Sequence, residues 1–345
     1  MEQSNLSDNV RLVVKENVLA VICDSALKIV SSAIYNGGVN QANAVLNVGV
    51  PEGYNDLSLH LDPLKLITSS AAKLGITKNY LAMVTAAKIA NYSLSTEKTA
   101  DFSVSVAATA GCQHGESSGE EMDVQEIAGT INIIVVIDGN PSESCMVAAL
   151  VTATESKSAA LRDFDVRSRY TGDSATGSVT DSITIASTNK GRMLVLGGPA
   201  SKLGKLVGNC VRRAVTEALL KQEPFWGRRT VLDRLKERLL PVEKLASEVS
   251  KVEGLTITAE SLAELLKNNP FAGAYLLAAA KMDDDYKKNL LPAYFPRWEE
   301  ASKCFGEYSA CKHDYIEQQD YPKVDLPLFV KYALIKVVKT SQNKS

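Results

Sequence analysis

The chain has 345 residues, of which 45% are hydrophobic and 23% charged, with a formal net charge of -2 and an isoelectric point near 6.0. This charge balance excludes the strongly basic surface of a nucleic-acid-binding protein and a polybasic membrane patch. No basic segment followed by an apolar one opens the chain, and the apolar run 131–137 is far shorter than the roughly 20 residues that cross a bilayer. We therefore expect a cytoplasmic protein with one large domain or two ordinary ones.

Cysteine and histidine usage bears on metal and disulfide chemistry. The six cysteines are scattered and none forms a C-x-x-C pair, so we expect reduced thiols. The three histidines, His60, His114 and His313, have none of the spacings of zinc hydrolases, and no G-x-S-x-G elbow occurs. A zinc site and an α/β-hydrolase nucleophile are therefore not expected.

The first quarter of the chain carries a hairpin signal and a helix signal. Two β-prone runs flank 15–17 and predict a hairpin over 11–23. Asp62 as N-cap, Pro63 at the first helical position and Gly75 just past the end predict a helix between them.

The middle of the chain alternates strands and long helices. Alternation of apolar with polar or small residues predicts a half-buried strand over 102–106. The continuous apolar run 130–137 predicts a central strand buried on both faces, and 182–187 predicts another strand. Long helices are expected over 142–164 and 199–222. The fold class is thus mixed α/β of the α+β type, with a β-sheet packed against long helices.

Beyond Phe225 the sequence pattern becomes typical of helices. Stretches rich in Leu, Ala, Lys and Glu predict helices over 231–252, 258–269 and 273–291. We place a domain boundary there, with one domain at 1–224 and a helical C-terminal region at 225–345. For that region a packing or dimerisation role is favoured over a partner-binding module.

Small polar residues gather at the predicted element ends. Taken singly, each is more often a cap, a turn or a satisfied core hydroxyl. Glu155 and Lys157 lie two apart, so on a regular helix they do not share a face and at most one can enter a site; a polar helix face with an ordinary surface lysine stays an open alternative. These small polar residues are Ser31, Ser32, Asn36, Asn47, Thr85, Thr109, Thr130, Asn132, Thr152, Thr154, Thr176, Thr180 and Asp181.

The glycine-rich stretch 197–208 has two interpretations. It lacks the G-x-x-x-x-G-K-[ST] spacing of a P-loop. A turn with close helix packing is favoured over contact with an anionic or amide-rich ligand.

Seven sequence blocks, in the order given at the end of this paragraph, resemble the block pattern of the adenosylcobinamide amidohydrolase family over roughly residues 27–220. Ser156 and Ser178 depart from the family's usual Thr-Glu-Ala-Lys and Ala-Thr-Gly-Thr, and 112–122 is less like its usual loop. The blocks are "VSSAIYNGG", "NVGVPEGY", "VTAAK", "GTINIIVVIDG", "VTATESKSAALRDFDV", "SATGSVTDSITIAS" and "SKLGKLVGNCVRRAVTEAL".

The resemblance implies hydrolysis of the amide that joins an aminopropanol arm to the corrin ring of adenosylcobinamide. The products would be adenosylcobyric acid and 1-amino-2-propanol, in corrinoid salvage for cobamide (vitamin B12) biosynthesis. The cobalt-containing corrinoid would be the substrate and no cofactor would be required. The expected partner is this small molecule, with no nucleic acid and no membrane, and a homo-oligomer is possible.

Amide hydrolysis needs an activated nucleophile, donors for the developing oxyanion and a proton for the leaving amine. Without a metal or a histidine, a carboxylate must serve as base, with Glu155 the first choice and Asp181 the second. Lys157 or the amide of Asn132 would hold the oxyanion. Attack by water is favoured over attack by Thr130.

A corrin carries a rim of amide side chains, so its pocket needs many short donors and acceptors. The backbone at Gly37 and Gly38 would approach the ligand closely. The other expected substrate-binding residues are Ser31, Ser32, Asn36, Asn47, Thr85, Thr154, Thr176 and Thr180.

Two further functions stay open. A non-catalytic corrinoid carrier or sensor would share the pocket but tolerate loss of Glu155 without loss of binding. An amidohydrolase of another small amide is kept open by the altered loop 112–122.

Overall fold

The computed structural model describes residues 2–51, 62–112, 115–121, 129–292 and 321–342. The predictions that involve the three histidines, the block residues 52–54, the loop residues 113–114 and 122, and Cys304 and Cys311 lie outside these ranges.

The chain forms two compact units. The first contains Met1–Tyr170 and Ser174–Arg228, and the second contains Thr171–Asp173 and Arg229–Ser345. The main segment of the second unit therefore begins four residues after Phe225. The second unit also includes three residues from the loop before β10.

The first unit is built on a nine-stranded mixed sheet with the order β1-β2-β3-β10-β8-β7-β6, in which β4 pairs with β3 and β5. The β10–β8 and β4–β5 pairs are parallel and the others are antiparallel. Its strands are β1 (Glu2–Ser7), β2 (Val10–Lys15), β3 (Val18–Ser31), β4 (Gly38–Gly49), β5 (Tyr80–Thr85), β6 (Ser93–Lys98), β7 (Ser103–Gly111), β8 (Thr130–Asp138) and β10 (Ser182–Ser187), and a separate pair is formed by β9 (Asn140–Pro141) and β11 (Met193–Leu194).

The sheet curls so that its two halves face each other across an apolar core. Strand β3 is long enough to pair with β2 along its first half and with β10 along its last four residues. Side chains of β2, β3, β4 and β5 then meet those of β7, β8 and β10, with Leu27, Val45 and Met83 packed against Ala107 and Ile134. This curl brings strands that are not hydrogen-bonded neighbours into side-chain contact.

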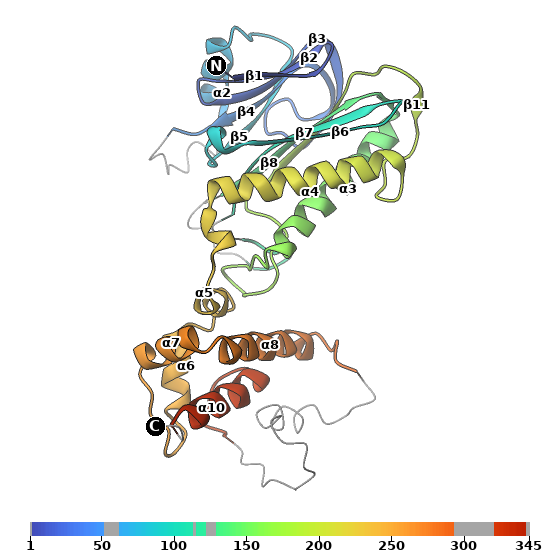
Figure 1. Cartoon of the computed structure of the whole chain (residues 1–345). Coiled ribbons are helices and arrows are strands. Elements are labelled where there is room, and N and C mark those ends of the chain that lie inside the picture. Colours follow the sequence, from blue (N-terminus) through green and yellow to red (C-terminus); the bar gives the residue numbers. More distant parts are fainter. Residues whose placement is uncertain (1, 52–61, 113–114, 122–128, 293–320, 343–345) are drawn as a thin grey trace. The chain divides into compact units, whose positions relative to one another are not determined.

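Helices cover both outer faces. Helices α3 (Glu143–Asp163) and α4 (Lys202–Gln222) lie side by side against β7, β8 and β10 (Figure 1). The shorter α2 (Leu64–Lys73) covers β4. Short 3₁₀ turns occupy Ile89–Asn91 and Pro224–Gly227.

The mixed α+β class is confirmed, as are the hairpin over 11–23 and the two long helices, whose N-caps are Ser142 and Ser201. β8 is buried on both faces, as predicted. The strand predicted over 102–106 is present as β7, but the prediction that it is half-buried was wrong: Ser105 is 2% exposed, because the outer face of β7 is covered by α4 and its inner face by the curled sheet. The N-cap of α2 is Pro63, one residue later than predicted.

The second unit is helical. Leu276 of α8 and Phe329 of α10 are fully buried in a core to which every described helix of the unit contributes. The predicted helix over 231–252 is interrupted by Leu239, which has φ +60°, and by Pro241. The described helices are α5 (Val231–Lys236), α6 (Val242–Val249), α7 (Ala259–Asn268), α8 (Pro270–Lys287) and α10 (Leu328–Gln342). Within the described ranges of the chain, no helix has the length and apolar character of a membrane span.

Candidate functional site

A buried ion pair joins α3 to the start of β10. Lys157 points inward from α3 and donates to Oδ2 of Asp181, and the two side chains are 9% and 11% exposed. A charged group is removed from water at high cost unless a partner and further hydrogen bonds compensate it. The pair therefore holds one ammonium group in a fixed place inside the first unit.

Asp181 is itself held by several donors. Its Oδ1 accepts from the Ile131 backbone N–H at 3.0 Å and from the Ser178 hydroxyl at 2.5 Å, and its Oδ2 accepts from the Ser178 backbone N–H at 3.1 Å. Bonds of this kind to a carboxylate are short and strong. A Cβ at Gly177 would lie 2.7 Å from Lys157 Nζ and closer still to Asp181, so a side chain at this position would shift the pair.

Two threonines stand next to this pair. Thr130, the first residue of β8, is 1% exposed, and its Oγ1 lies 2.8 Å from Oγ1 of Thr180. Thr180 directly precedes Asp181, and Ile131, which follows Thr130, donates to the same carboxylate. The hydroxyl pair thus lies one residue along the chain from Asp181, where β8 and β10 begin.

Asn132 lies two residues after Thr130 along β8, and its side chain faces the inside of the curled sheet. Its Nδ2 donates to Asn47 Oδ1 at 2.8 Å and to the Val84 carbonyl at 2.9 Å, and Asn47 Nδ2 donates to Thr109 Oγ1 at 2.8 Å. Asn132 is 1% exposed, and its Oδ1 has no donor among the described residues. Leaving a buried acceptor unpaired costs on the order of 1–3 kcal/mol, so this atom calls for an explanation.

This arrangement bears on the oxyanion role predicted for the Asn132 amide. Both Nδ2 hydrogens are already donated to protein acceptors. The atom left for a ligand is therefore an acceptor, whereas an oxyanion needs donors. Of the two predicted oxyanion groups, Lys157 is the one that carries donors.

Other predicted substrate-binding residues border the same end of the sheet. Ser31 Oγ lies 2.7 Å from Thr184 Oγ1, Ser32 Oγ lies 3.3 Å from Ser182 Oγ, and the Thr85 hydroxyl accepts from the Ala87 N–H. Each of these hydroxyls has a partner within the protein.

The turn between β3 and β4 holds the next three. Asn36 has φ +53° and donates to the Tyr80 carbonyl. A Cβ at Gly37 would collide with the Ala33 carbonyl, and Gly38 has φ +90°. The geometry of this turn alone accounts for both glycines.

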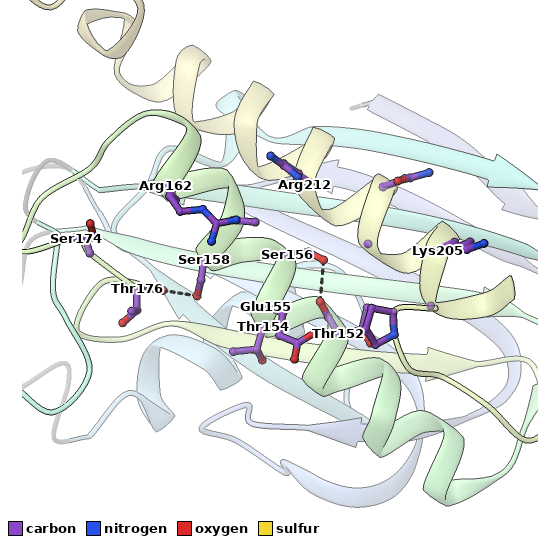
Figure 2. Close-up of a pocket in the computed structure, with 16 residues that line it drawn as sticks. Thr152, Thr154, Glu155, Ser156, Ser158, Arg162, Ser174, Thr176, Lys205 and Arg212 are labelled. Carbon is purple, nitrogen blue, oxygen red and sulfur yellow. Dashed lines mark hydrogen bonds between the residues drawn. The ribbon is translucent and has the colours of Figure 1, made fainter. Parts of the chain in front are cut away.

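Glu155, Thr154 and Thr176 lie elsewhere, along a groove between α3 and α4 with a volume of about 760 Å³ (Figure 2). Glu155 is exposed on the side of α3 that faces away from Lys157, as the two-residue spacing requires. The Ser158 hydroxyl donates to the Thr176 carbonyl at 3.0 Å and fixes one end of the groove.

Glycines of α4 form part of the groove wall. A Cβ at Gly204 would collide with the Gly198 carbonyl, and one at Gly208 would lie 3.3 Å from Ser156 Oγ. Close packing therefore accounts for Gly204. This agrees with the favoured interpretation of the glycine-rich stretch, which is a turn with close helix packing.

The structure thus divides the predicted catalytic residues. Lys157, Asp181 and Thr130 lie where β8 and β10 begin, Asn132 faces the inside of the curled sheet, and Glu155 lies on the outer groove.

Cys112 lies close to the Lys157–Asp181 pair, but its thiol is not suited to act as a nucleophile. Its Sγ is 3.8 Å from the Gly177 carbonyl, to which it donates. Burial, and then the negative charges of Asp181 and Glu223, raise the pKa of the Cys112 thiol well above its usual value. Since the thiolate is the reactive form, this cysteine is inert at neutral pH.

Sequence reasoning missed Ser178, Gly177 and Thr109 as members of the site. The signal for Ser178 was present, because a Ser three residues before an Asp can donate both its hydroxyl and its backbone N–H to that carboxylate. Thr109 was noted as a polar end residue, but its contact with Asn47 depends on the curl of the sheet.

The first unit thus combines a mixed α+β fold with a buried ammonium–carboxylate pair and nearby hydroxyl side chains. A family model described as adenosylcobinamide amidohydrolase (CbiZ) matches residues 3–225. The chain belongs to this family, as its sequence blocks predict.

A curated relative is the uncharacterized protein MJ1613 of Methanocaldococcus jannaschii. It is 30% identical over 172 residues, which cover 44% of this chain and 67% of that protein. The family match ends at residue 225, and the main segment of the second unit begins at Arg229. Apart from Thr171–Asp173, the second unit therefore lies outside the family match.

Proposed function

We propose that this protein hydrolyses the amide between the aminopropanol arm and the corrin ring of adenosylcobinamide, giving adenosylcobyric acid and 1-amino-2-propanol. The observation that carries the proposal is the buried Lys157–Asp181 pair beside Thr130, in a chain of the adenosylcobinamide amidohydrolase family. The corrinoid is the substrate, and the proposed chemistry uses only side chains of the protein.

Lys157 is the proposed electrophilic group. Its ammonium has three N–H donors, of which one is directed at Asp181. The remaining donors would stabilise the negative charge that develops on the carbonyl oxygen, in a site where water is largely excluded. Asp181 and Gly177 keep the ammonium in place during this step.

Asp181 is the proposed proton acceptor in place of Glu155, because it pairs with Lys157 and accepts from the backbone N–H of Ile131, the residue after Thr130, whereas Glu155 faces the groove. Water held by the Thr130 hydroxyl would attack the carbonyl carbon and pass its proton to Asp181. The Ser178 hydroxyl is the one donor on Asp181 that can rotate away to free an oxygen. The leaving amine would then take that proton.

The test is incubation of the purified protein with adenosylcobinamide, followed by chromatography of the corrinoid and detection of 1-amino-2-propanol. Both products in equal amounts are expected. Tight corrinoid binding without turnover would support the carrier function, and turnover of other small amides alone would support a different amidohydrolase.

A further inference from the structure

The groove between α3 and α4 is lined by neither member of the Lys157–Asp181 pair, and it has a charge of its own. Its volume of about 760 Å³ lies in the range of small-molecule sites. Because the whole chain has a formal net charge of -2, the groove concentrates positive charge on a weakly acidic protein. The charged residues that line it are the cations Arg162, Lys205 and Arg212 and the carboxylate Glu155.

Short side chains on the facing helices leave the space in the groove. Ala159 of α3 and Gly204 and Gly208 of α4 are among the residues that line it. All four charged residues of the lining are exposed. A solute that enters the groove can therefore reach their charged ends.

Two guanidinium groups lie at one end of the groove. Asp163, which follows Arg162 in α3, accepts from Nε and Nη2 of Arg212 at 2.6 Å each, so this ion pair holds Arg212 beside Arg162 (Figure 2). Nη1 of Arg212 and the hydroxyl of Ser174, at the same end, have no hydrogen-bond partner among the described residues. In the same part of the chain, the Arg162 guanidinium has neither a hydrogen bond nor an ion pair. Planar guanidinium donors of this kind match the oxygens of a phosphate group.

The other end of the groove offers an acceptor and a donor. Glu155 precedes Arg162 by seven residues and Lys205 precedes Arg212 by seven, so each lies two turns, or about 10 Å, back along its helix. Neither side chain has a hydrogen bond or an ion pair with a residue that the structure describes. Because the Glu155 carboxylate repels an anion, the groove favours a molecule with its negative charge at the arginine end and hydroxyl or amino donors at the other.

We propose that the groove binds a nucleoside monophosphate, whose phosphate is held by Arg162 and by Nη1 of Arg212. A phosphate monoester carries nearly two negative charges at neutral pH. The sugar and base of a nucleotide supply hydroxyl and amino donors for Glu155, at the separation from the phosphate that the two turns of helix require. This site is distinct from the Lys157–Asp181 pair, and its occupancy does not depend on the proposed hydrolysis.

Calorimetric titration of the purified protein with AMP, adenosine and inorganic phosphate tests the site. AMP should bind more tightly than adenosine or phosphate, and its affinity should fall as the salt concentration rises. In Arg162→Gln the affinity for AMP should fall about tenfold. Lys202→Gln is the matched control and should keep wild-type affinity, because Lys202 is an exposed lysine of α4 that does not line the groove. No binding of AMP to the wild type at millimolar concentration, or equal losses in the two variants, would overturn the proposal.

A variant of Glu155 tests which end of the groove holds each part of the nucleotide. In Glu155→Ala the ratio of the affinity for AMP to that for inorganic phosphate should fall, because the carboxylate contacts only the sugar or base. The same ratio should be unchanged in Lys202→Gln. Equal melting temperatures of the ligand-free variants and the wild type exclude unfolding as the cause. A ratio that Glu155→Ala leaves at the wild-type value would contradict the proposal.

Discussion

Replacing Lys157 by Met should destabilise the first unit and abolish turnover. Both side chains of the pair are about nine-tenths buried, so the variant leaves the carboxylate of Asp181 without its counter-charge. Removing one member of a buried pair typically costs 3–5 kcal/mol, and the three hydrogen bonds that Asp181 keeps from Ser178 and Ile131 place the expected loss near the lower end, at about 3 kcal/mol.

Calorimetry and a double-mutant cycle measure this effect. A loss of about 3 kcal/mol in a unit of this size lowers the melting temperature by roughly 6–12 °C. Because the penalty in Lys157→Met comes from the unpaired carboxylate, the double variant Lys157→Met/Asp181→Asn should lose less than the two single variants summed. Additive losses would refute the inference that the two groups stabilise one another.

Further predictions concern four other positions. Gly177→Ala should reduce kcat/KM by about 100-fold or more, because its Cβ displaces the ion pair, whereas Gly198→Ala, where a Cβ meets nothing within 4 Å, should leave turnover unchanged. Glu155→Gln should retain near-normal kcat if Asp181 is the base, and a loss of about 100-fold would return that role to Glu155. In the second unit, burial raises the pKa of Asp283 from 3.8 to about 6, against the opposing effect of its hydrogen bonds to α10. The folded state then holds its proton more tightly than the unfolded state, so the contribution of Asp283 to stability should be greatest below pH 4 and fall by roughly 3 kcal/mol as the pH rises past 6. Denaturation measured across this range should show the fall in the wild type and a much smaller one in Asp283→Asn.

Local signals were sufficient for most elements of the first unit. The caps at Ser142 and Ser201 and the apolar run of β8 follow from short-range chemistry, and the structure confirms them. The burial of Ser105 could not be predicted in this way, because it depends on which elements cover each face of β7.

The site could be predicted only in part for the same reason. The spacing of Glu155 and Lys157 indicated that at most one of them enters a site, but not which one. The pairing of Lys157 with Asp181 spans 24 residues, and that of Asn132 with Asn47 spans 85. The first contact follows from the packing of α3 on the sheet and the second from the curl of the sheet, and no local pattern encodes either.

The central claim is that the Lys157–Asp181 pair carries out hydrolysis of the adenosylcobinamide amide. The most direct measurement is single-turnover conversion of adenosylcobinamide to adenosylcobyric acid by wild type, Lys157→Met and the Gly198→Ala control, each shown to be folded. Full conversion is expected for wild type and control, and a rate lower by about 100-fold or more for Lys157→Met. Comparable conversion by all three would contradict it.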